Sequence, residues 1–293
     1  MTPQNIKIYL DCNSFCNYYI SIMKNTDKKV ALFAGALSLP FLTRDALRKN
    51  GWEVYVIGLK NFYDPKLNPD LVIRLGGAGT AARECKKRGI RKLMFVGALG
   101  HVNLSDIRPD LWSLSVLISV LKHQRGYDSM AVAFTKALEK RGYEVVAAQD
   151  LAPELTFEKP GIQTKVKPSK SDERDIERAI QVSHTIGRED IGASVVVDKQ
   201  VIAVEAAEGT ARMLERVVEM RKNRRKTGGV FAKMTKPGQD LRIDIPAIGV
   251  DTIKAVAAAK LHGIIVNTKT CFVIDKKAVL DTANKAKIFI KAI

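Results

Sequence analysis

The chain has 293 residues, of which 46% are hydrophobic and 27% charged, the composition of an ordinary globular protein with room for two domains. Its formal net charge of +17 at pH 7 restricts the partners to nucleic acid, an anionic lipid surface or a highly anionic substrate. No apolar run reaches the roughly 18 residues that a membrane-spanning helix needs, so we expect none.

The N-terminal residues and the cysteines point to a cytosolic protein. Residues 1–27 lack the charged start and cleavage site of a signal peptide, and we interpret them as an N-terminal extension, with an interfacial amphipathic segment as the alternative. The spacing of the cysteines is not that of a zinc site, so we expect reduced thiols. The four cysteines are Cys12, Cys16, Cys85 and Cys271.

Apolar runs alternate with helical stretches from residue 28 onwards. Five runs predict buried strands, at 30–34, 53–58, 71–75, 92–97 and 143–147. The stretches between them predict helices, at 40–50, 80–89, 109–123 and 127–141. This α/β alternation is typical of a parallel, Rossmann-like sheet with right-handed crossovers, in an N-terminal domain that we place at residues 28–158.

A glycine-rich turn, L-G-G-A-G-T at 75–80, follows the third predicted strand. Gly76, Gly77 and Gly79 would let backbone N–H groups approach a phosphate at the start of the next helix. The turn lacks both the full G-x-G-x-x-G spacing and a P-loop lysine, so a plain tight turn explains it equally well.

Residues 151–172 interrupt the alternation with prolines and have the composition of a linker. We place a second α/β domain, of catalytic type, at residues 159–293. Ser171 is expected to cap its first helix, which would end near Gly187. The further elements expected are a hairpin at 195–204, a helix at 211–225, strands within 230–246, a helix at 250–262, strands at 264–266 and 271–274, and a last helix at 276–286.

The sequence V-E-A-A-E-G-T at 204–210 leads from the hairpin into a helix. Thr210 is the expected N-cap, and Gly209 permits close approach of a ligand to the backbone. Free N–H groups at this point would attract phosphate, with Glu205 and Glu208 just before them. A capped helix whose acidic residues interact with the helix dipole is the simpler interpretation.

Basic and acidic residues alternate with apolar or turn residues in K-M-T-K-P-G-Q-D-L-R-I-D-I-P-A-I-G at 233–249. If this stretch is extended, Arg242 and Asp244 share one face and the apolar side chains the other. Cations on that face would bind phosphate oxygens, and carboxylates would hold a metal ion. An exposed edge strand protected by its charges explains the same pattern without a ligand.

Five ordered blocks carry a resemblance to a known family. They read A-G-A-L-S-L-P at 34–40, G-Y-D-S-M at 126–130, R-E-D-I-G-A-S-V-V-V at 188–197, V-E-A-A-E-G-T-A-R-M-L at 204–214 and K-P-G-Q-D-L-R-I-D-I-P-A-I-G at 236–249. In these blocks the chain resembles the UDP-2,3-diacylglucosamine pyrophosphatases of lipid A biosynthesis, in the form that is not a calcineurin-like phosphoesterase. The resemblance covers about residues 28–293.

The chain departs from the family pattern at several polar or glycine positions. Ala211 stands where the family usually has an aspartate after E-G-T, so an expected metal ligand or water-activating base is missing. Because several positions differ together, the pattern favours divergence over one inactivating change. The other departures are Leu37 for a glycine, Tyr127 for an acidic residue, Ala193 for an amide and Ala247 for a hydroxyl.

The resemblance implies Mg²⁺-dependent hydrolysis of UDP-2,3-diacylglucosamine to UMP and 2,3-diacylglucosamine 1-phosphate, in the cleft between the two domains. We predict that Asp240 and Asp244 hold Mg²⁺ or position water, next to Ala211 at the place of the family aspartate. The residues predicted to bind the substrate are Gly35, Gly76, Gly77, Gly79, Asp128, Asp190, Glu208, Gly209, Thr210, Lys233, Lys236, Gln239 and Arg242.

The expected location is the cytoplasm, with peripheral association to the anionic surface of the inner membrane. The basic run R-K-N-R-R-K at 221–226 would contact that surface, although interaction with the helix dipole explains the run without a membrane. A homodimer is left open. The alternative functions are an inactive homologue that binds the lipid nucleotide, a basic nucleic-acid-binding protein and a generic metabolite-binding domain. Because no aromatic–basic recognition motif occurs, we expect no nucleic-acid partner.

Overall fold

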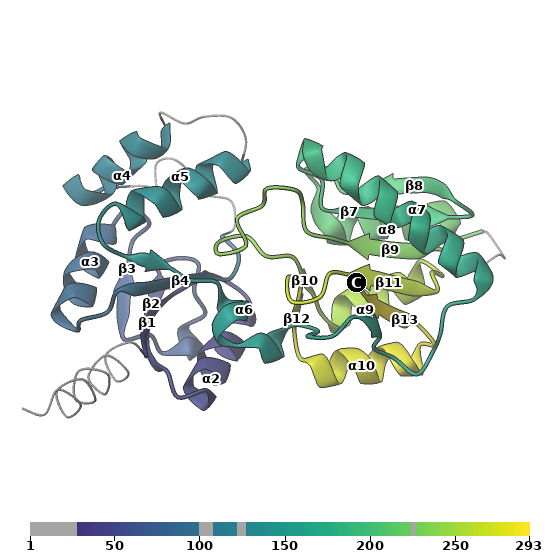
Figure 1. Ribbon diagram of the computed structural model, residues 1–293, viewed down its shortest axis with the longest axis horizontal. Coiled ribbons are helices and arrows are strands. Elements are labelled where there is room, and N and C mark those ends of the chain that lie inside the picture. The colour runs from purple at the N-terminus through teal and green to yellow at the C-terminus, as the bar shows by residue number, and fades with distance from the viewer. Residues whose placement is uncertain (1–27, 100–107, 122–126, 224–226) are drawn as a thin grey trace, which may run out of the picture.

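A computed structural model describes residues 28–99, 108–121, 127–223 and 227–293. Two α/β lobes lie side by side, with α6 (Ala148–Leu151) between them (Figure 1). The first lobe contains a five-stranded sheet, and the second contains a six-stranded sheet and a two-stranded one. In the ranges that the structure describes, no helix is long and apolar enough to cross a bilayer.

The first lobe is built on a parallel sheet with the strand order β3-β2-β1-β4-β5. The strands are β1 (Lys29–Ala34), β2 (Glu53–Leu59), β3 (Leu71–Ile73), β4 (Lys92–Val96) and β5 (Glu144–Val145). The helices are α2 (Leu39–Lys49), α3 (Ala78–Lys87), α4 (Leu111–Leu121) and α5 (Tyr127–Glu139). The predicted Rossmann-like parallel sheet is therefore confirmed.

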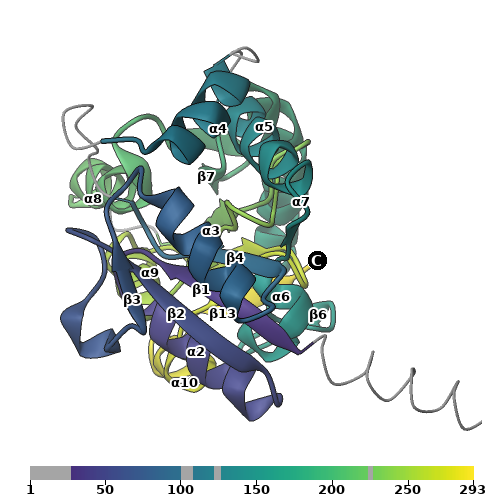
Figure 2. The same ribbon diagram turned by 90° about the vertical axis from the view of Figure 1, so that its left-hand side faces the viewer.

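Both faces of this sheet are covered by helices, which is why its strands are mainly apolar after their first residues. Leu32 of β1 belongs to a buried cluster with Leu47 of α2, whereas its neighbour Phe33 belongs to another cluster with Ala81 of α3. Alternate residues of one strand thus serve opposite layers. Figure 2 shows α2 and α3 on opposite sides of the sheet.

The second lobe has a mixed sheet with the order β6-β13-β11-β9-β7-β8, in which β9, β11 and β13 are parallel. Its strands are β6 (Gly161–Ile162), β7 (Ala193–Val197), β8 (Gln200–Val204), β9 (Val230–Lys233), β11 (Gly263–Val266) and β13 (Phe289–Ala292). A separate pair is formed by β10 (Ala247–Ile248) and β12 (Phe272–Val273). The helices are α7 (Lys170–Ile186), α8 (Gly209–Arg221), α9 (Val250–Ala258) and α10 (Lys276–Lys285).

The second lobe has three layers. Ile176 and Ala179 of α7 pack on one face of the sheet, whereas Leu214 of α8, Val256 of α9 and Val279 of α10 pack on the other. The predicted hairpin is confirmed as β7–β8, with Asp198 and Lys199 in the left-handed conformation that a tight hairpin turn requires.

Two predictions for the second lobe were wrong. Residues 161 and 162, assigned to a linker, form the edge strand β6 against β13, a strand that the sequence pattern did not predict. The local sequence of β6 does not show this pairing, because its partner strand lies at the far end of the second lobe's sequence. The N-cap of α7 is Ser169 instead of Ser171, and it forms a capping box with Asp172.

Cys85 and Cys271 are free and buried, which confirms the prediction of reduced thiols for these two. Burial raises the pKa of Cys85 to about 11 and that of Cys271 to about 12, so neither is a ready nucleophile. Cys12 and Cys16 lie outside the described residues.

Candidate functional site

Residues 234–246 form a loop between β9 and β10, so the prediction of one extended, charged face was wrong. Pro237 and Gly238 form a turn, with Gly238 at a φ of +81°. A second turn follows, in which the N–H groups of Ile243 and Asp244 both donate to the Asp240 carbonyl oxygen. The charged side chains consequently divide between two places, one in the second lobe and one at the junction of the lobes.

The first part of the candidate site surrounds Lys233, the last residue of β9. Its ammonium donates to Glu205 Oε2 at 2.8 Å and to Thr210 Oγ1 at 2.7 Å. The Thr210 hydroxyl donates to Glu205 Oε1 at 2.7 Å, so it does not cap α8 as predicted. Glu208 occupies the N-cap position without a side-chain cap. Pairing of β9 with β7, and of β7 with β8, brings these residues together.

The second part surrounds Lys236, three residues further along the loop. Its ammonium is paired with Asp190 and lies 3.8 Å from Asp244 Oδ2. Gln239 links the two sides, since its Oε1 accepts the Lys236 N–H at 3.0 Å and its Nε2 donates to Asp244 Oδ2 at 2.7 Å. Asp190 adopts a left-handed φ of 64° at the turn before Gly192, a conformation that aspartate tolerates better than most residues.

The two parts adjoin at Gly192. A side-chain carbon there would lie 4.0 Å both from Glu205 Oε2 and from Lys236 Cγ. We call the seven residues the β9 cluster: Asp190, Glu205, Thr210, Lys233, Lys236, Gln239 and Asp244. Its two ammonium groups face three carboxylates, and the Lys233 and Glu205 side chains are only 16% and 17% exposed. Such a set can bind an anionic group by exchanging lysine–carboxylate pairs for lysine–phosphate pairs.

Ala211 follows Thr210 in the first turn of α8 and is exposed. The position of the missing family aspartate therefore borders the β9 cluster at a helix N-terminus. Gly209 begins the same turn with a φ of +79°. Glu208 bonds to Arg216 at 2.7 Å, and its own backbone N–H and Arg216 lower its pKa.

Asp240 faces the first lobe instead. Its carboxylate accepts bonds from Arg242 Nε at 2.8 Å, from Arg242 Nη2 at 2.7 Å and from the Thr135 hydroxyl at 3.1 Å. Arg242 Nη1 also donates to Glu139 Oε1 at 2.5 Å. We call Thr135, Glu139, Asp240 and Arg242 the interlobe clasp, because the first two belong to α5. Burial alone would raise the pKa of Asp240, but the bonds from Arg242 and Thr135 hold it below its usual value.

The glycines predicted to bind substrate in the first lobe are explained by close packing. A side-chain carbon at Gly35 would lie 2.7 Å from the Ala98 carbonyl oxygen, where the ends of β1 and β4 meet. At the start of α3, the Gly79 N–H donates to Asp110 at 2.9 Å and the Ala78 N–H donates to Ser113 at 3.0 Å. The groups that a phosphate would need are thus already bonded within the lobe.

Two further glycines of that turn are also constrained by packing. Gly76 has a φ of +101°, and a side-chain carbon there would lie 3.0 Å from the Arg108 backbone. The Gly77 N–H donates to the Arg74 carbonyl oxygen at 2.8 Å. Asp128 stands in the first turn of α5, where the structure describes only the backbone.

Mg²⁺ is the cofactor that the resemblance implies. Among the residues that the structure describes, no group of three or more His, Cys, Asp or Glu side chains is placed to hold a metal ion alone. Asp240 does not fit, because both its oxygens accept bonds from the clasp. Asp190 and Asp244 fit, since they are 47% and 58% exposed and approach the same Lys236 ammonium. Mg²⁺ is often held by one or two carboxylates together with substrate phosphates.

Comparisons with known proteins agree on one family. The model described as the LpxI N-terminal domain matches residues 29–155, and the model of the LpxI C-terminal domain matches residues 159–291. A relative named UDP-2,3-diacylglucosamine pyrophosphatase LpxI, from Caulobacter vibrioides, is 33% identical over 271 residues, which is 90% of this chain and 96% of the relative. This chain belongs to the LpxI family. The resemblance inferred from the five sequence blocks is therefore confirmed.

The two LpxI domain ranges divide the candidate residues. The β9 cluster lies wholly in the C-terminal range, and the interlobe clasp joins that range to α5 of the N-terminal one. Glu205 and Thr135 were not among the predicted site residues. Glu205 lies just before E-G-T, and this position could have identified it as a site residue. No sequence feature places Thr135 beside Asp240.

Proposed function

We propose that this chain hydrolyses UDP-2,3-diacylglucosamine to UMP and 2,3-diacylglucosamine 1-phosphate. Membership of the LpxI family over both domains carries the proposal, because the relative that is 33% identical is named for this activity. The β9 cluster supports it with the chemistry that a diphosphate needs, namely two ammonium groups, of which that of Lys233 bonds to Thr210 in the first turn of α8.

The cluster would act by exchange of partners. Lys233 and Lys236 would leave Glu205 and Asp190 for phosphate oxygens, and the N–H groups of the first turn of α8 would bind the same oxygens. The released carboxylates would then be free to orient the attacking water, Glu205 being held at this place by the Thr210 hydroxyl. Charge neutralisation and positioning are the main contributions that a protein makes to phosphoryl transfer.

We expect Lys233→Ala and Lys236→Ala each to weaken binding of the lipid nucleotide at least about tenfold, the effect of losing roughly 1.4 kcal/mol of interaction. Isothermal titration calorimetry with the detergent-solubilised substrate measures this. Lys254→Ala is the matched control, because Lys254 is exposed and pairs with Asp251 on α9, outside the cluster. Equal affinity for the lipid nucleotide in all three variants would show that the β9 cluster is not part of the substrate site.

We propose that Mg²⁺ is held by Asp244 and Asp190 together with the substrate diphosphate. When bound, the ion would neutralise the diphosphate charge that builds up during cleavage. We expect Asp244→Asn to weaken binding of Mn²⁺, a paramagnetic substitute, about tenfold or more in the presence of UDP, since even outer partners of a metal ligand have effects of this size. Asp240→Asn should leave Mn²⁺ affinity unchanged. A loss confined to Asp240→Asn would assign the ion to the clasp residue instead.

Ala211 favours a second candidate, an LpxI homologue that binds the lipid nucleotide and turns it over slowly or not at all. The backbone N–H groups of α8 do not depend on the missing carboxylate, so phosphate binding would persist. Loss of a general base typically lowers the rate by about 10²–10⁴-fold. Tight binding with slow release of UMP is therefore the behaviour that we expect of this chain.

We further propose that the protein associates peripherally with the anionic surface of the inner membrane. The net charge of +17 supports this, as does the lipid-tailed substrate proposed above. The run at 221–226 contributes less than the sequence suggests. Arg221 is only 4% exposed and donates to the Gly228 carbonyl oxygen at 2.9 Å, and residues 224–226 lie outside the described part of the chain.

A further inference from the structure

The outer face of α4 is apolar. Leu111, Leu114 and Ile118 are 88%, 40% and 47% exposed, and their spacing of three and four residues places them on one side of the helix. The helix contains no acidic or basic residue between its first and last positions. A surface helix of a globular protein normally presents polar side chains to water, so this face is the reverse of the expected pattern.

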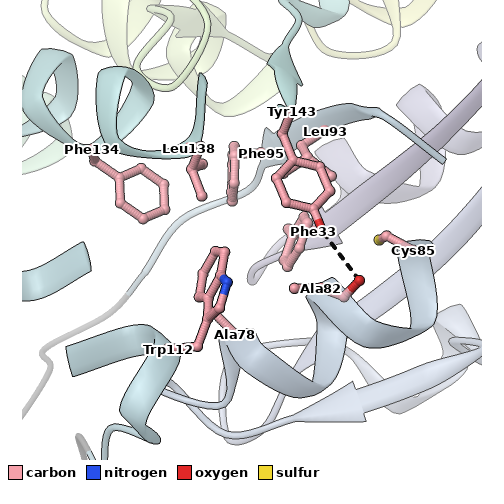
Figure 3. A pocket seen from close by; sticks show the side chains of 10 residues that line it. All are labelled: Phe33, Ala78, Ala82, Cys85, Leu93, Phe95, Trp112, Phe134, Leu138 and Tyr143. Carbon is pink, nitrogen blue, oxygen red and sulfur yellow. Dashed lines mark hydrogen bonds between the residues drawn. The ribbon is translucent and has the colours of Figure 1, made fainter. Parts of the chain in front are cut away.

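The inner face of α4 already packs against the rest of the lobe. The three exposed apolar side chains are therefore not misplaced core residues. Val116 is buried in a cluster with Ala133 and Ala137 of α5. Trp112 points into an apolar cavity of about 30 Å³ together with Phe95 and Phe134 (Figure 3). The N-terminus of the helix is fixed as well, because Asp110 accepts the Ser113 N–H at 2.7 Å. The helix is therefore anchored on the lobe and presents a second apolar face outward.

Guanidinium groups border this face. Arg108 is exposed three residues before Leu111, and Arg83 is exposed on α3, which packs beside α4. Arg141, two residues after the end of α5, donates to the Ser115 hydroxyl, on the same side of α4 as the two leucines, at 2.6 Å and stacks over Trp112. Asp110, just before the helix, is engaged by the N–H groups of Gly79 and Ser113. Exposed apolar side chains with arginines nearby match the acyl region and the anionic headgroups of a bilayer.

We propose that the outer face of α4 is the surface by which this protein docks on an anionic bilayer. Leu111, Leu114 and Ile118 enter the headgroup boundary, and Arg83, Arg108 and Arg141 contact the lipid phosphates. A second copy of the chain fits less well, because a stable interface buries roughly 1,200–2,000 Å² and three side chains supply a small part of that area. This inference rests on the proposed membrane association but not on the proposed hydrolysis.

Vesicle sedimentation tests the proposal with the full chain and without substrate. We expect the protein to pellet with phosphatidylethanolamine–phosphatidylglycerol vesicles, to pellet less as salt rises, and to stay in solution with phosphatidylcholine vesicles. Leu111→Ser combined with Ile118→Ser should weaken partitioning at least about tenfold, or roughly 1.4 kcal/mol. Arg83→Gln with Arg108→Gln should weaken it and flatten the salt dependence. Val201→Ser on β8 is the control, because Val201 is 39% exposed in the other lobe.

Each remaining outcome bears on a different claim. If the wild-type chain does not bind anionic vesicles, membrane association itself is refuted. If the wild-type chain binds and both double variants bind as well as it does, the protein associates through another surface and the α4 proposal fails. If Leu111→Ser halves the mass in light scattering without lipid and vesicle binding persists, the face is a contact between two copies. Leu111→Ser alone, at a position 88% exposed, guards against misfolding of the double variant.

Discussion

Replacing Ala211 by aspartate is expected to raise the rate of UMP release from UDP-2,3-diacylglucosamine at least about tenfold, a cautious part of the range for a general base. The position lies in the first turn of α8, beside Thr210 and the Lys233–Glu205 pair. An aspartate there also interacts favourably with the helix dipole, so the change should not harm folding. Steady-state release of UMP, measured by chromatography, gives the rate.

Ala211→Asn is the matched control, because it has the shape of aspartate without the charge. An equal gain from both changes would show that the carboxylate is not what the site lacks. No gain from either would shift attention to the other departures from the family pattern. Ala193 is buried at the start of β7, and Ala247 begins β10 at the end of the 234–246 loop. Rapid turnover by the chain as written would contradict the role assigned to position 211.

Arg242→Ala is expected to lower the free energy of unfolding by about 3 kcal/mol, the lower end of the range for removing one partner of a buried ion pair. The variant would leave the Asp240 carboxylate, 5% exposed, with the Thr135 hydroxyl as its main remaining side-chain donor. It would also remove both bonds that Arg242 makes to α5, one to Glu139 and one to the Thr135 hydroxyl oxygen. Urea denaturation at neutral pH, followed by fluorescence, measures the loss.

Two further measurements separate the interlobe clasp from a general effect of losing an arginine. Arg88→Ala should cost far less, because Arg88 pairs with Glu84 on the exposed side of α3. The pKa of Asp240 is lowered in the folded state, so its contribution is present above the unfolded value near 3.9 and is lost as the pH falls through the folded value. Wild type and Arg242→Ala should thus converge in stability below about pH 4. A constant difference down to lower pH would mean that the clasp does not act through Asp240.

Local sequence patterns predicted the first lobe well because its elements follow from local chemistry. The run V-A-L-F-A at 30–34 is apolar on both faces, as a strand covered by helices must be. Pro40 lies in the first turn of α2, where its missing N–H costs nothing. The Asp198-Lys199 turn was also predictable from local sequence, because two β-branched runs flank these two residues. Both adopt the left-handed conformation that a two-residue hairpin loop needs.

Prediction failed where a distant segment decides the conformation. Residues 161 and 162 form a strand by pairing with β13, which lies at the far end of the second lobe's sequence. Arg242 and Asp240 were assigned to the same site as Lys233, although they turn towards α5 and bond to Thr135 and each other. The alternating charges could not reveal this, because two turns divide the loop and each side chain follows its own partner.

The candidate site was partly predictable for the same reasons. Lys233, Lys236, Asp190 and Asp244 were named as site residues, and the structure brings them together at the end of β9. Glycines were harder to interpret, since a phosphate site and a close backbone crossing need the same residue. The carbonyl oxygen of Ala98, 2.7 Å from where a side-chain carbon of Gly35 would lie, is invisible in the sequence.

We propose above that this LpxI homologue cleaves the diphosphate of a lipid-linked UDP-sugar. A single-turnover reaction tests it most directly, with the chain in excess over UDP-2,3-diacylglucosamine and ³¹P NMR of the products, because slow chemistry is then still visible. We expect the diphosphate signals to disappear and two monophosphate signals to grow in equal amounts, those of UMP and 2,3-diacylglucosamine 1-phosphate. Release of intact UDP, or bound substrate that stays uncleaved even with Ala211→Asp, would contradict it.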